Sequence, residues 1–256
     1  MSAAWTLVGI DCATQEDRMG LCRMVLGADG ALQVERLTLG TAGESPAANV
    51  CQWIAGQERY VLAFDAPLGW PKSLGEHLST HVAGDALSAP SEELFRRKTD
   101  RFVQKALGKL PPEVGADRIA RTARAALGLL GEVRALAGHA VPLSWRQGKD
   151  AGAIEVFPAA TLITRGLPTT GYKTDTAAGR KLRARILERI EAEVEMSTAR
   201  ELMIEDPNLL DALICALAAA DFARGLCEEP TELEHAKKEG FIWFRSTGQR
   251  ALSYGG

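Results

Sequence analysis

Four acidic residues are the ones in this sequence best suited to chemistry. Asp11 and Asp65 each end a short apolar run, Glu155 lies inside a third, and Asp211 stands near the start of a longer one. Carboxylate oxygens, in a chain with only four histidines, suit hard cations such as Mg²⁺ or Mn²⁺. Two such ions about 4 Å apart can activate water and stabilise the leaving oxygen in phosphodiester hydrolysis. These residues are therefore predicted to be the metal ligands and catalytic residues of a hydrolase.

The same four residues also have plainer interpretations. An Asp at the end of a strand often only caps a turn or helix, and Glu155 could be a surface charge on an edge strand. Asn208 at the N-cap with Asp211 at N3 would resemble a capping box, and a carboxylate there suits the helix dipole. Spacing alone leaves both interpretations open.

Two basic residues could hold a phosphate oxygen of the substrate. Lys173 and Arg97 are candidates, because a charged donor makes a strong hydrogen bond to phosphate. Arg97 also lies close to Asp100, which equally suits an ordinary salt-bridged helix. His77 and His81 have a spacing that can hold zinc, but no third ligand is evident.

The pattern of apolar residues predicts the strands and helices that would position these residues. Three short apolar segments joined by short loops predict an antiparallel meander. A hairpin turn is expected at 28–30, where Gly30 supplies a positive φ. A helix then leads to a strand that ends at Asp65. The expected elements of this half are strands 4–11, 19–27 and 31–39, helix 46–57 and strand 60–65.

The second half is expected to be mostly helical. The expected elements are helices 72–82, 91–107 and 117–136, strand 153–157, helices 159–165, 176–195 and 208–224, and a short strand within 241–244. Three antiparallel strands followed by strands reached through helices describe a mixed α/β sheet with flanking helices, in the order of the ribonuclease-H-like fold. Strands one, four and five would then be adjacent and parallel, with Asp11 and Asp65 about 5 Å apart at one edge. We expect a single domain, 1–256, with a helical insertion at 66–150.

Composition limits the classes of function. The 256 residues are 46% hydrophobic and 25% charged, which excludes a wholly disordered chain, and the net charge of −3 argues against coating long nucleic acid by charge. Five cysteines without a C-x-x-C pair, and no secretion signal, predict a cytoplasmic protein. The most apolar stretch, 209–222, is broken by Asp211 and Asp221, which predicts a buried helix and no membrane span.

Seven short motifs, spread from Gly9 to Trp243, together resemble a known family. In order they are Gly9-Ile10-Asp11-Cys12, Ala63-Phe64-Asp65-Ala66-Pro67-Leu68-Gly69, Arg96-Arg97-Lys98-Thr99-Asp100, Ile154-Glu155-Val156-Phe157-Pro158-Ala159, Gly171-Tyr172-Lys173, Asp211-Ala212-Leu213 and Lys238-Glu239-Gly240-Phe241-Ile242-Trp243. The chain resembles domain-of-unknown-function family 429, which is grouped with predicted ribonuclease-H-like nucleases.

The resemblance implies a ribonuclease-H-like fold and the same four acids as metal ligands. Arg97, Asp100 and Lys173 match motif positions of the family. One departure is the segment 12–17, Cys-Ala-Thr-Gln-Glu-Asp, where many members have a glycine-rich turn that could cradle a nucleotide.

Three functions follow as hypotheses. The first is a divalent-metal-dependent phosphodiester hydrolase, or nuclease, whose substrate is a nucleic acid or phosphodiester that is short or structured. The second is a non-catalytic interaction module that kept the fold. The third is a nucleotide-binding phosphotransferase of the actin-like type, which shares the sheet order but needs two such domains.

Overall fold

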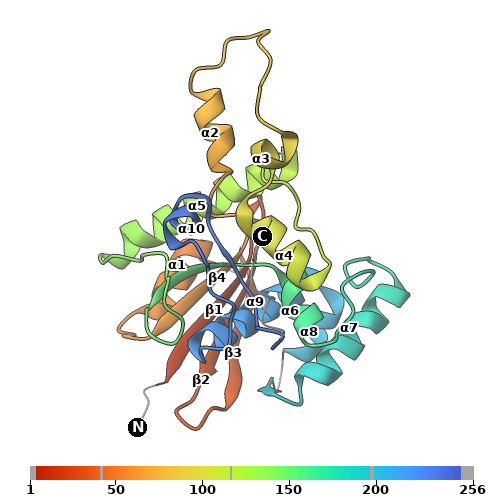
Figure 1. Cartoon of the computed structure of the whole chain (residues 1–256). Helices are drawn as coiled ribbons and strands as arrows, with labels where there is room; N and C mark the ends of the chain where they lie inside the picture. The colour runs from red at the N-terminus through yellow and green to blue at the C-terminus, as the bar shows by residue number, and fades with distance from the viewer. Residues whose placement is uncertain (1–3, 41–42, 116, 197–198, 249–256) are drawn as a thin grey trace.

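A mixed sheet of seven strands forms the centre of the molecule, in the order β6-β3-β2-β1-β4-β5-β7 (Figure 1). The computed structural model describes residues 4–40, 43–115, 117–196 and 199–248. Its strands are β1 (Trp5–Asp11), β2 (Gly20–Leu26), β3 (Leu32–Leu39), β4 (Tyr60–Asp65), β5 (Gly152–Val156), β6 (Val194–Glu195) and β7 (Ile242–Trp243). Strand β2 runs antiparallel to β1 and β3, whereas β1, β4, β5 and β7 are mutually parallel. The predicted ribonuclease-H-like α/β arrangement is confirmed.

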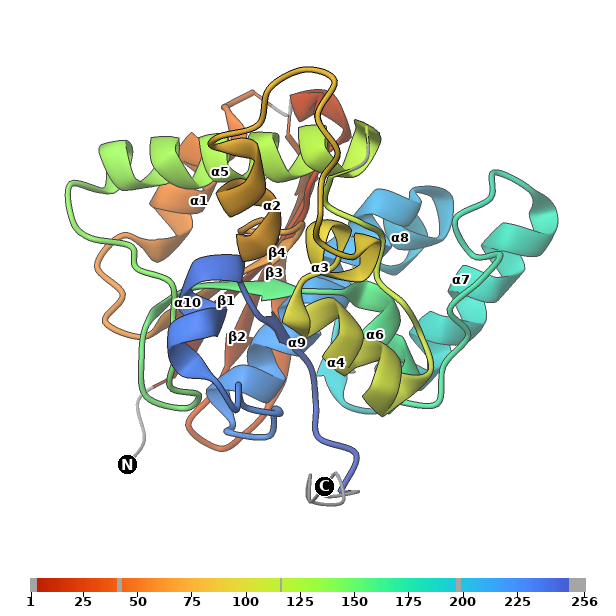
Figure 2. The ribbon, with the colours of Figure 1, turned by 45° about the horizontal axis from the view of Figure 1, so that its top comes forward.

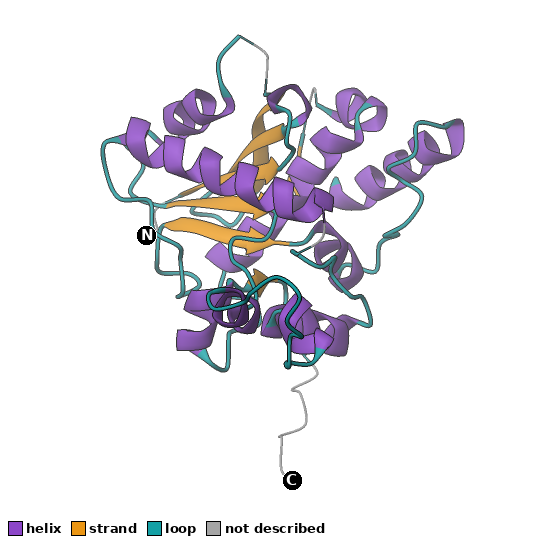
Figure 3. Cartoon of the chain, turned by 90° about the horizontal axis from the view of Figure 1, so that it is seen from above, coloured by secondary structure: helices purple, strands orange, loops and turns teal. Residues whose placement is uncertain are grey.

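Helices cover both faces of this sheet, so that its orange strands lie among purple helices in Figure 3. The helices are α1 (Pro46–Ile54), α2 (Lys72–Leu78), α3 (Ser91–Phe95), α4 (Lys98–Leu107), α5 (Asp117–Ala137), α6 (Pro158–Thr164), α7 (Ala177–Ile190), α8 (Arg200–Glu205), α9 (Pro207–Ala223) and α10 (Leu233–Glu239), with a 3₁₀ turn, η1 (Glu16–Arg18). Alternate residues of β1 face opposite layers: Val8 and Ile10 pack with α1 and α5, and Leu7 packs with α9. Both faces of β1 are therefore core.

Helix α9 lies unusually close to the sheet. A Cβ added at Gly9 would lie 1.9 Å from the carbonyl oxygen of Ala212, and one at Gly20 would lie 2.2 Å from that of Asn208. Only glycine permits this approach, because any side chain would overlap the helix backbone. The first turns of α9 are thus held against the ends of β1 and β2 where Asp11 lies.

The apolar stretch that forms α9 is a buried helix, as expected. The helix has 17 residues, and its second acid, Asp221, pairs with Arg165 at 2.8 Å. Within the described ranges, none of the helices combines the length and apolar character needed to cross a bilayer.

Expected helices 46–57 and 72–82 end earlier in the structure, at Ile54 and Leu78, and two others differ more. The expected helix 91–107 is two helices, because the backbone at Arg96 and Arg97 is extended and Arg97 forms the N-cap of α4. The expected helix 176–195 ends at Ile190, and Val194–Glu195 instead pairs with β3 as β6. Helices α8 and α10 were not expected; both are short, and propensity alone rarely predicts helices of this length.

Residues 66–150 contain α2, α3, α4 and α5; α2 and α3 stand at the top of Figure 1, whereas α4 lies lower, against α6 and α10. In Figure 2, where the top comes forward, α5 runs across the upper part of the view and α4 lies beside α6. Helix α5 has two roles: Leu130 and Val133 pack on the sheet beside α1, whereas Ile119 and Thr122, near its start, line a cavity above the strand ends. Part of this segment therefore belongs to the core layer.

Candidate functional site

Asp11 and Asp65 are paired across parallel strands. They are Cα partners at the last register position of β1 and β4. Because side chains two residues apart on a strand share a face, Asp11 lies on the same face as Gly9, the face that α9 covers. Both carboxylates therefore point toward α9 at the carboxyl edge of the sheet.

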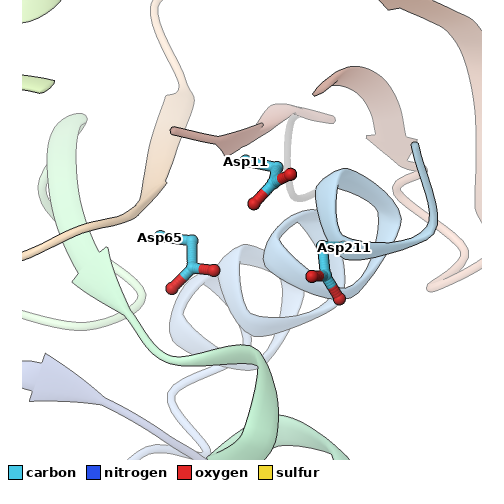
Figure 4. Close-up of side chains that lie close together, drawn as sticks. All are labelled: Asp11, Asp65 and Asp211. Carbon is cyan, nitrogen blue, oxygen red and sulfur yellow. The ribbon is translucent and has the colours of Figure 1, made fainter. Parts of the chain in front are cut away.

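Asp211, on α9, completes a group of three carboxylates. One oxygen from each of Asp11, Asp65 and Asp211 lies within 4.8 Å of the others (Figure 4). Asp211 is in this position because its neighbour Ala212 packs on Gly9. The predicted convergence of the acids at the ends of β1 and β4 is found, and these three residues could hold a metal ion.

The environment of this group disfavours negative charge. Burial, and then repulsion from Asp211 and Asp65, raises the pKa of Asp11 well above its usual value. Burial raises the pKa of Asp65 to about 7; Asp211 and Glu155 add to this rise, and Lys173 opposes it. Among the described residues, no N–H or O–H group donates a hydrogen bond to the carboxylate of Asp11 or Asp65. Carboxylates that are wholly or partly buried without donors are costly, and a divalent cation would offset that cost.

Asp211, in contrast, has partners for both oxygens. The Tyr172 hydroxyl donates to Oδ1 at 2.7 Å, and the Lys173 ammonium forms an ion pair with Oδ2. Burial raises the pKa of Asp211, and Lys173 and Tyr172 oppose the rise. Tyr172 was not predicted as a site residue, although it stands directly before Lys173.

Asp211 is not a helix cap, which corrects one of the interpretations open from the sequence. Asp206 is the N-cap of α9, and its Oδ1 accepts the backbone N–H of Asn208 at 2.8 Å. The helix begins at Pro207, so Asp211 lies beyond the first turn, where capping has no use for a carboxylate. Its burial, at 1% exposed, needs another explanation.

Glu155 is buried rather than a surface charge, and it is not one of the three converging acids. Its two carboxylate oxygens accept from Arg97 at 2.7 and 2.8 Å, and Oε2 also accepts the backbone N–H of Leu68 at 2.9 Å. Burial raises the pKa of Glu155, and Arg97 opposes that rise. Glu155 lines the same cavity as Asp65, but its oxygens are committed to a buried ion pair.

Arg97 has no N–H group left for a substrate phosphate. Nε and Nη2 donate to Asp100, Nη1 and Nη2 donate to Glu155, and Nη1 also donates to the carbonyl of Glu239. These contacts use all five donors of the guanidinium, which is 1% exposed. The predicted role of Arg97 in binding phosphate is therefore not supported by its surroundings.

Glu239 is another buried acid, and its structural role was not predicted from the sequence. Its carboxylate accepts the backbone N–H of Lys72 at 2.7 Å and that of Lys98 at 2.8 Å, the first residues of α2 and α4. A carboxylate at two helix N-termini is favoured by the helix dipoles. Its motif neighbour Gly240 has φ +87°, and a Cβ there would lie 2.7 Å from Glu155 Oε2. The C-terminal motif thus holds the first residues of α2 and α4 together.

A cavity of about 280 Å³ lies beside Asp11 and Asp65, which form part of its wall. Its polar lining includes Asp11, Asp65 and Lys173, and apolar residues form much of the rest. The apolar part comes largely from the segment after β4 and from the end of β5: Ala66, Pro67, Pro111, Pro112, Ile119, Val156 and Phe157. This volume is near the lower end of the range of small-molecule sites, which suits a small ligand or one terminal unit of a longer one.

Comparison with known proteins identifies the family of the chain. No curated protein and no solved structure matches the chain. A family model described as "Protein of unknown function (DUF429)" matches residues 9–235, which include all three converging aspartates and Lys173. The chain therefore belongs to the DUF429 family.

Proposed function

We propose that this protein is a divalent-metal-dependent phosphodiester hydrolase that acts on a short or structured nucleic acid or on a small phosphodiester. The observation that carries the proposal is the convergence of Asp11, Asp65 and Asp211 within 4.8 Å beside a cavity. Asp11 is buried and Asp65 is half-buried, and among the described residues neither carboxylate accepts a hydrogen bond. Oxygen-only donors of this kind suit Mg²⁺ or Mn²⁺.

Each residue has a distinct part in this proposal. Asp11 and Asp65 would hold the cation from the strand ends, and Asp211 would hold it from α9. When bound, the cation would supply activation of water and stabilisation of charge at phosphorus. Lys173, whose side chain is 57% exposed, would approach a non-bridging oxygen of the phosphate. The buried pair of Glu155 and Arg97 would keep the cavity wall in place rather than contact substrate.

The cavity favours a small substrate group over continuous duplex. Pro111 and Pro112 lie on the side contributed by the segment after β4, together with Ile119 of α5. An apolar wall facing acids and one lysine fits an ester that has a charged phosphate and an apolar or aromatic group. A nucleotide end meets this description, as does an aryl phosphodiester.

The test is metal-dependent hydrolysis by the purified protein. Bis(p-nitrophenyl) phosphate, a dinucleotide, single-stranded oligonucleotides and duplex would be incubated with Mg²⁺, with Mn²⁺ or with chelator. We expect hydrolysis only with metal, and faster on the small and single-stranded substrates. Asp11→Asn and Asp65→Asn should each lower the rate at least about a hundredfold, which is roughly 2.7 kcal/mol of barrier. Exposed Asp17→Asn is the matched control for the change of charge.

A non-catalytic module is the second candidate, and one observation favours it. Lys173 already neutralises part of the acidic group through Asp211, so the fold can be maintained without a metal ion. Calorimetric titration separates the two candidates. Wild type that binds no divalent ion at millimolar concentration would refute the hydrolase and favour the module.

A further inference from the structure

The Lys173 side chain already pairs with the carboxylate of Asp211, which a metal ion at this site would need as a ligand. Its ammonium pairs with Oδ2 of Asp211, while Oδ1 is taken by the Tyr172 hydroxyl. Of the basic side chains that line the cavity, Lys173 and Arg97, the second has all five donors engaged. Among the described residues that line the cavity, Lys173 is thus the basic side chain available to neutralise the three carboxylates.

The two partners of Asp211 differ in how freely they can leave. Tyr172 is 2% exposed and packs in the main core, so its hydroxyl is fixed. Lys173 is 57% exposed, lies in the loop between α6 and α7, and has a long side chain with several rotatable bonds. Breaking its ion pair moves an ammonium toward solvent without disturbing the core.

A divalent ion and the Lys173 ammonium would compete for Asp211. An ion shared by Asp11, Asp65 and Asp211 needs an oxygen of each acid, and both oxygens of Asp211 are already engaged, Oδ1 by the Tyr172 hydroxyl and Oδ2 by the Lys173 ammonium. Two like charges at contact distance in a buried site repel strongly. Binding of the ion therefore requires the ammonium to withdraw.

We propose that Lys173 is a built-in counter-cation of the acidic group, and that a divalent ion binds by exchange with it. The exchange sets the metal affinity, because each binding event breaks the ion pair with Asp211. The released ammonium remains at the edge of the cavity, where the phosphate of a substrate would arrive. This inference rests on the proposed function and adds to it how the site behaves before metal is bound.

The first test measures metal affinity in matched variants. Mn²⁺ would be titrated calorimetrically into wild type, Lys173→Gln and Lys181→Gln at one ionic strength; Lys181 is exposed on α7 and gives the same change of net charge. We expect Lys173→Gln to bind Mn²⁺ about tenfold more tightly, or ~1.4 kcal/mol, and Lys181→Gln to match wild type. Unchanged or weaker binding by Lys173→Gln would overturn the exchange while leaving the hydrolase proposal intact. No binding by any of the proteins would overturn both.

The second test follows the lysine itself in wild type, so that it does not depend on a variant that folds. The amines would be acetylated briefly with and without saturating Mn²⁺, and each labelled peptide quantified by mass spectrometry. Exchange predicts that labelling of Lys173 rises severalfold with Mn²⁺ while that of Lys181 stays constant. A lysine that only repels the ion from a fixed position would give tighter binding in Lys173→Gln but no change in labelling. That combination would refute the exchange.

Discussion

Asp11 and Asp65 are register partners at the last paired position of the parallel strands β1 and β4. This pairing alone places two carboxylates side by side at the carboxyl edge of the sheet, before any helix is considered. The helix α9 then adds Asp211, because Gly9 allows its backbone to touch β1. The site is thus built from one strand pair and one close helix contact.

The first prediction concerns pH and the metal-free protein. Burial, with repulsion from Asp211 and Glu155, raises the pKa of Asp65 to about 7, from a usual value of 3.8. The folded state therefore keeps a proton that the unfolded chain releases, so the stability associated with Asp65 is full below pH 4 and is lost as pH rises through 7. Replacing Asp65 by Asn removes this loss.

Urea unfolding in chelator between pH 4.5 and 8 measures that difference. The free energy of unfolding of Asp65→Asn, relative to wild type, should increase with pH by up to about 1.4 kcal/mol per pH unit until pH 7. Asp17→Asn, at an exposed position, should follow wild type. A difference between Asp65→Asn and wild type that stays constant with pH would show that the buried carboxyl does not titrate as described.

The second prediction assigns Arg97 to stability. Arg97→Met would leave Glu155 and Asp100 buried without their counter-charge, and removing one member of a buried ion pair typically costs about 3–5 kcal/mol. The neighbouring Arg96→Met breaks pairs with Glu92 and Glu113 nearer the surface, where each pair is worth about 1 kcal/mol or less. Thermal and chemical unfolding of both variants checks the contrast. Equal losses would mean that the network around Arg97 contributes no more than surface pairs.

The third prediction concerns the contact that places Asp211. Gly9→Ala adds a methyl group where the Ala212 carbonyl lies 1.9 Å away, so α9 must shift. Overpacking of this kind costs about 1–3 kcal/mol or more, and the shift should also weaken Mn²⁺ binding by moving Asp211 from Asp11. Gly128→Ala in α5 is the control, because nothing lies within 4 Å of the added atom and alanine favours a helix by roughly 0.5–1 kcal/mol. Gly9→Ala with wild-type stability and Mn²⁺ affinity would contradict the close packing.

The sequence sufficed for the described strands other than β6, because their apolar runs are short, end in polar residues and follow a regular order. Asp11 and Asp65 could be paired from that order alone, since parallel strands end at the same edge. Glu155 looked equivalent, but its environment depends on Arg97, 58 residues earlier in the chain, and no local pattern encodes such a pair. The same limit applies to Glu239, which holds the N–H groups of Lys72 and Lys98 across more than 140 residues of chain.

The start of α9 shows a finer limit. The order Asn208 then Asp211 fits a capping box, but Asp206 directly before Pro207 also matches a cap followed by proline at the first helical position. The structure begins the helix at Pro207, whose fixed φ suits the first helical position, so Asp206 becomes the cap. That shift of two residues changes Asp211 from a capping residue to a site residue.

The last prediction separates these two aspartates by experiment. Asp206→Ala removes the acceptor for the Asn208 N–H and should lower the free energy of unfolding by about 1 kcal/mol, while Mn²⁺ affinity stays close to that of wild type. Asp211→Asn keeps an oxygen for the Tyr172 hydroxyl but loses the charge beside Asp11 and Asp65, so Mn²⁺ should bind at least about tenfold more weakly, ~1.4 kcal/mol. Calorimetric titration and urea unfolding on both variants give the two quantities independently. If Asp206→Ala lost metal affinity and Asp211→Asn kept it, the carboxylate group would be assigned to the wrong side of the helix start.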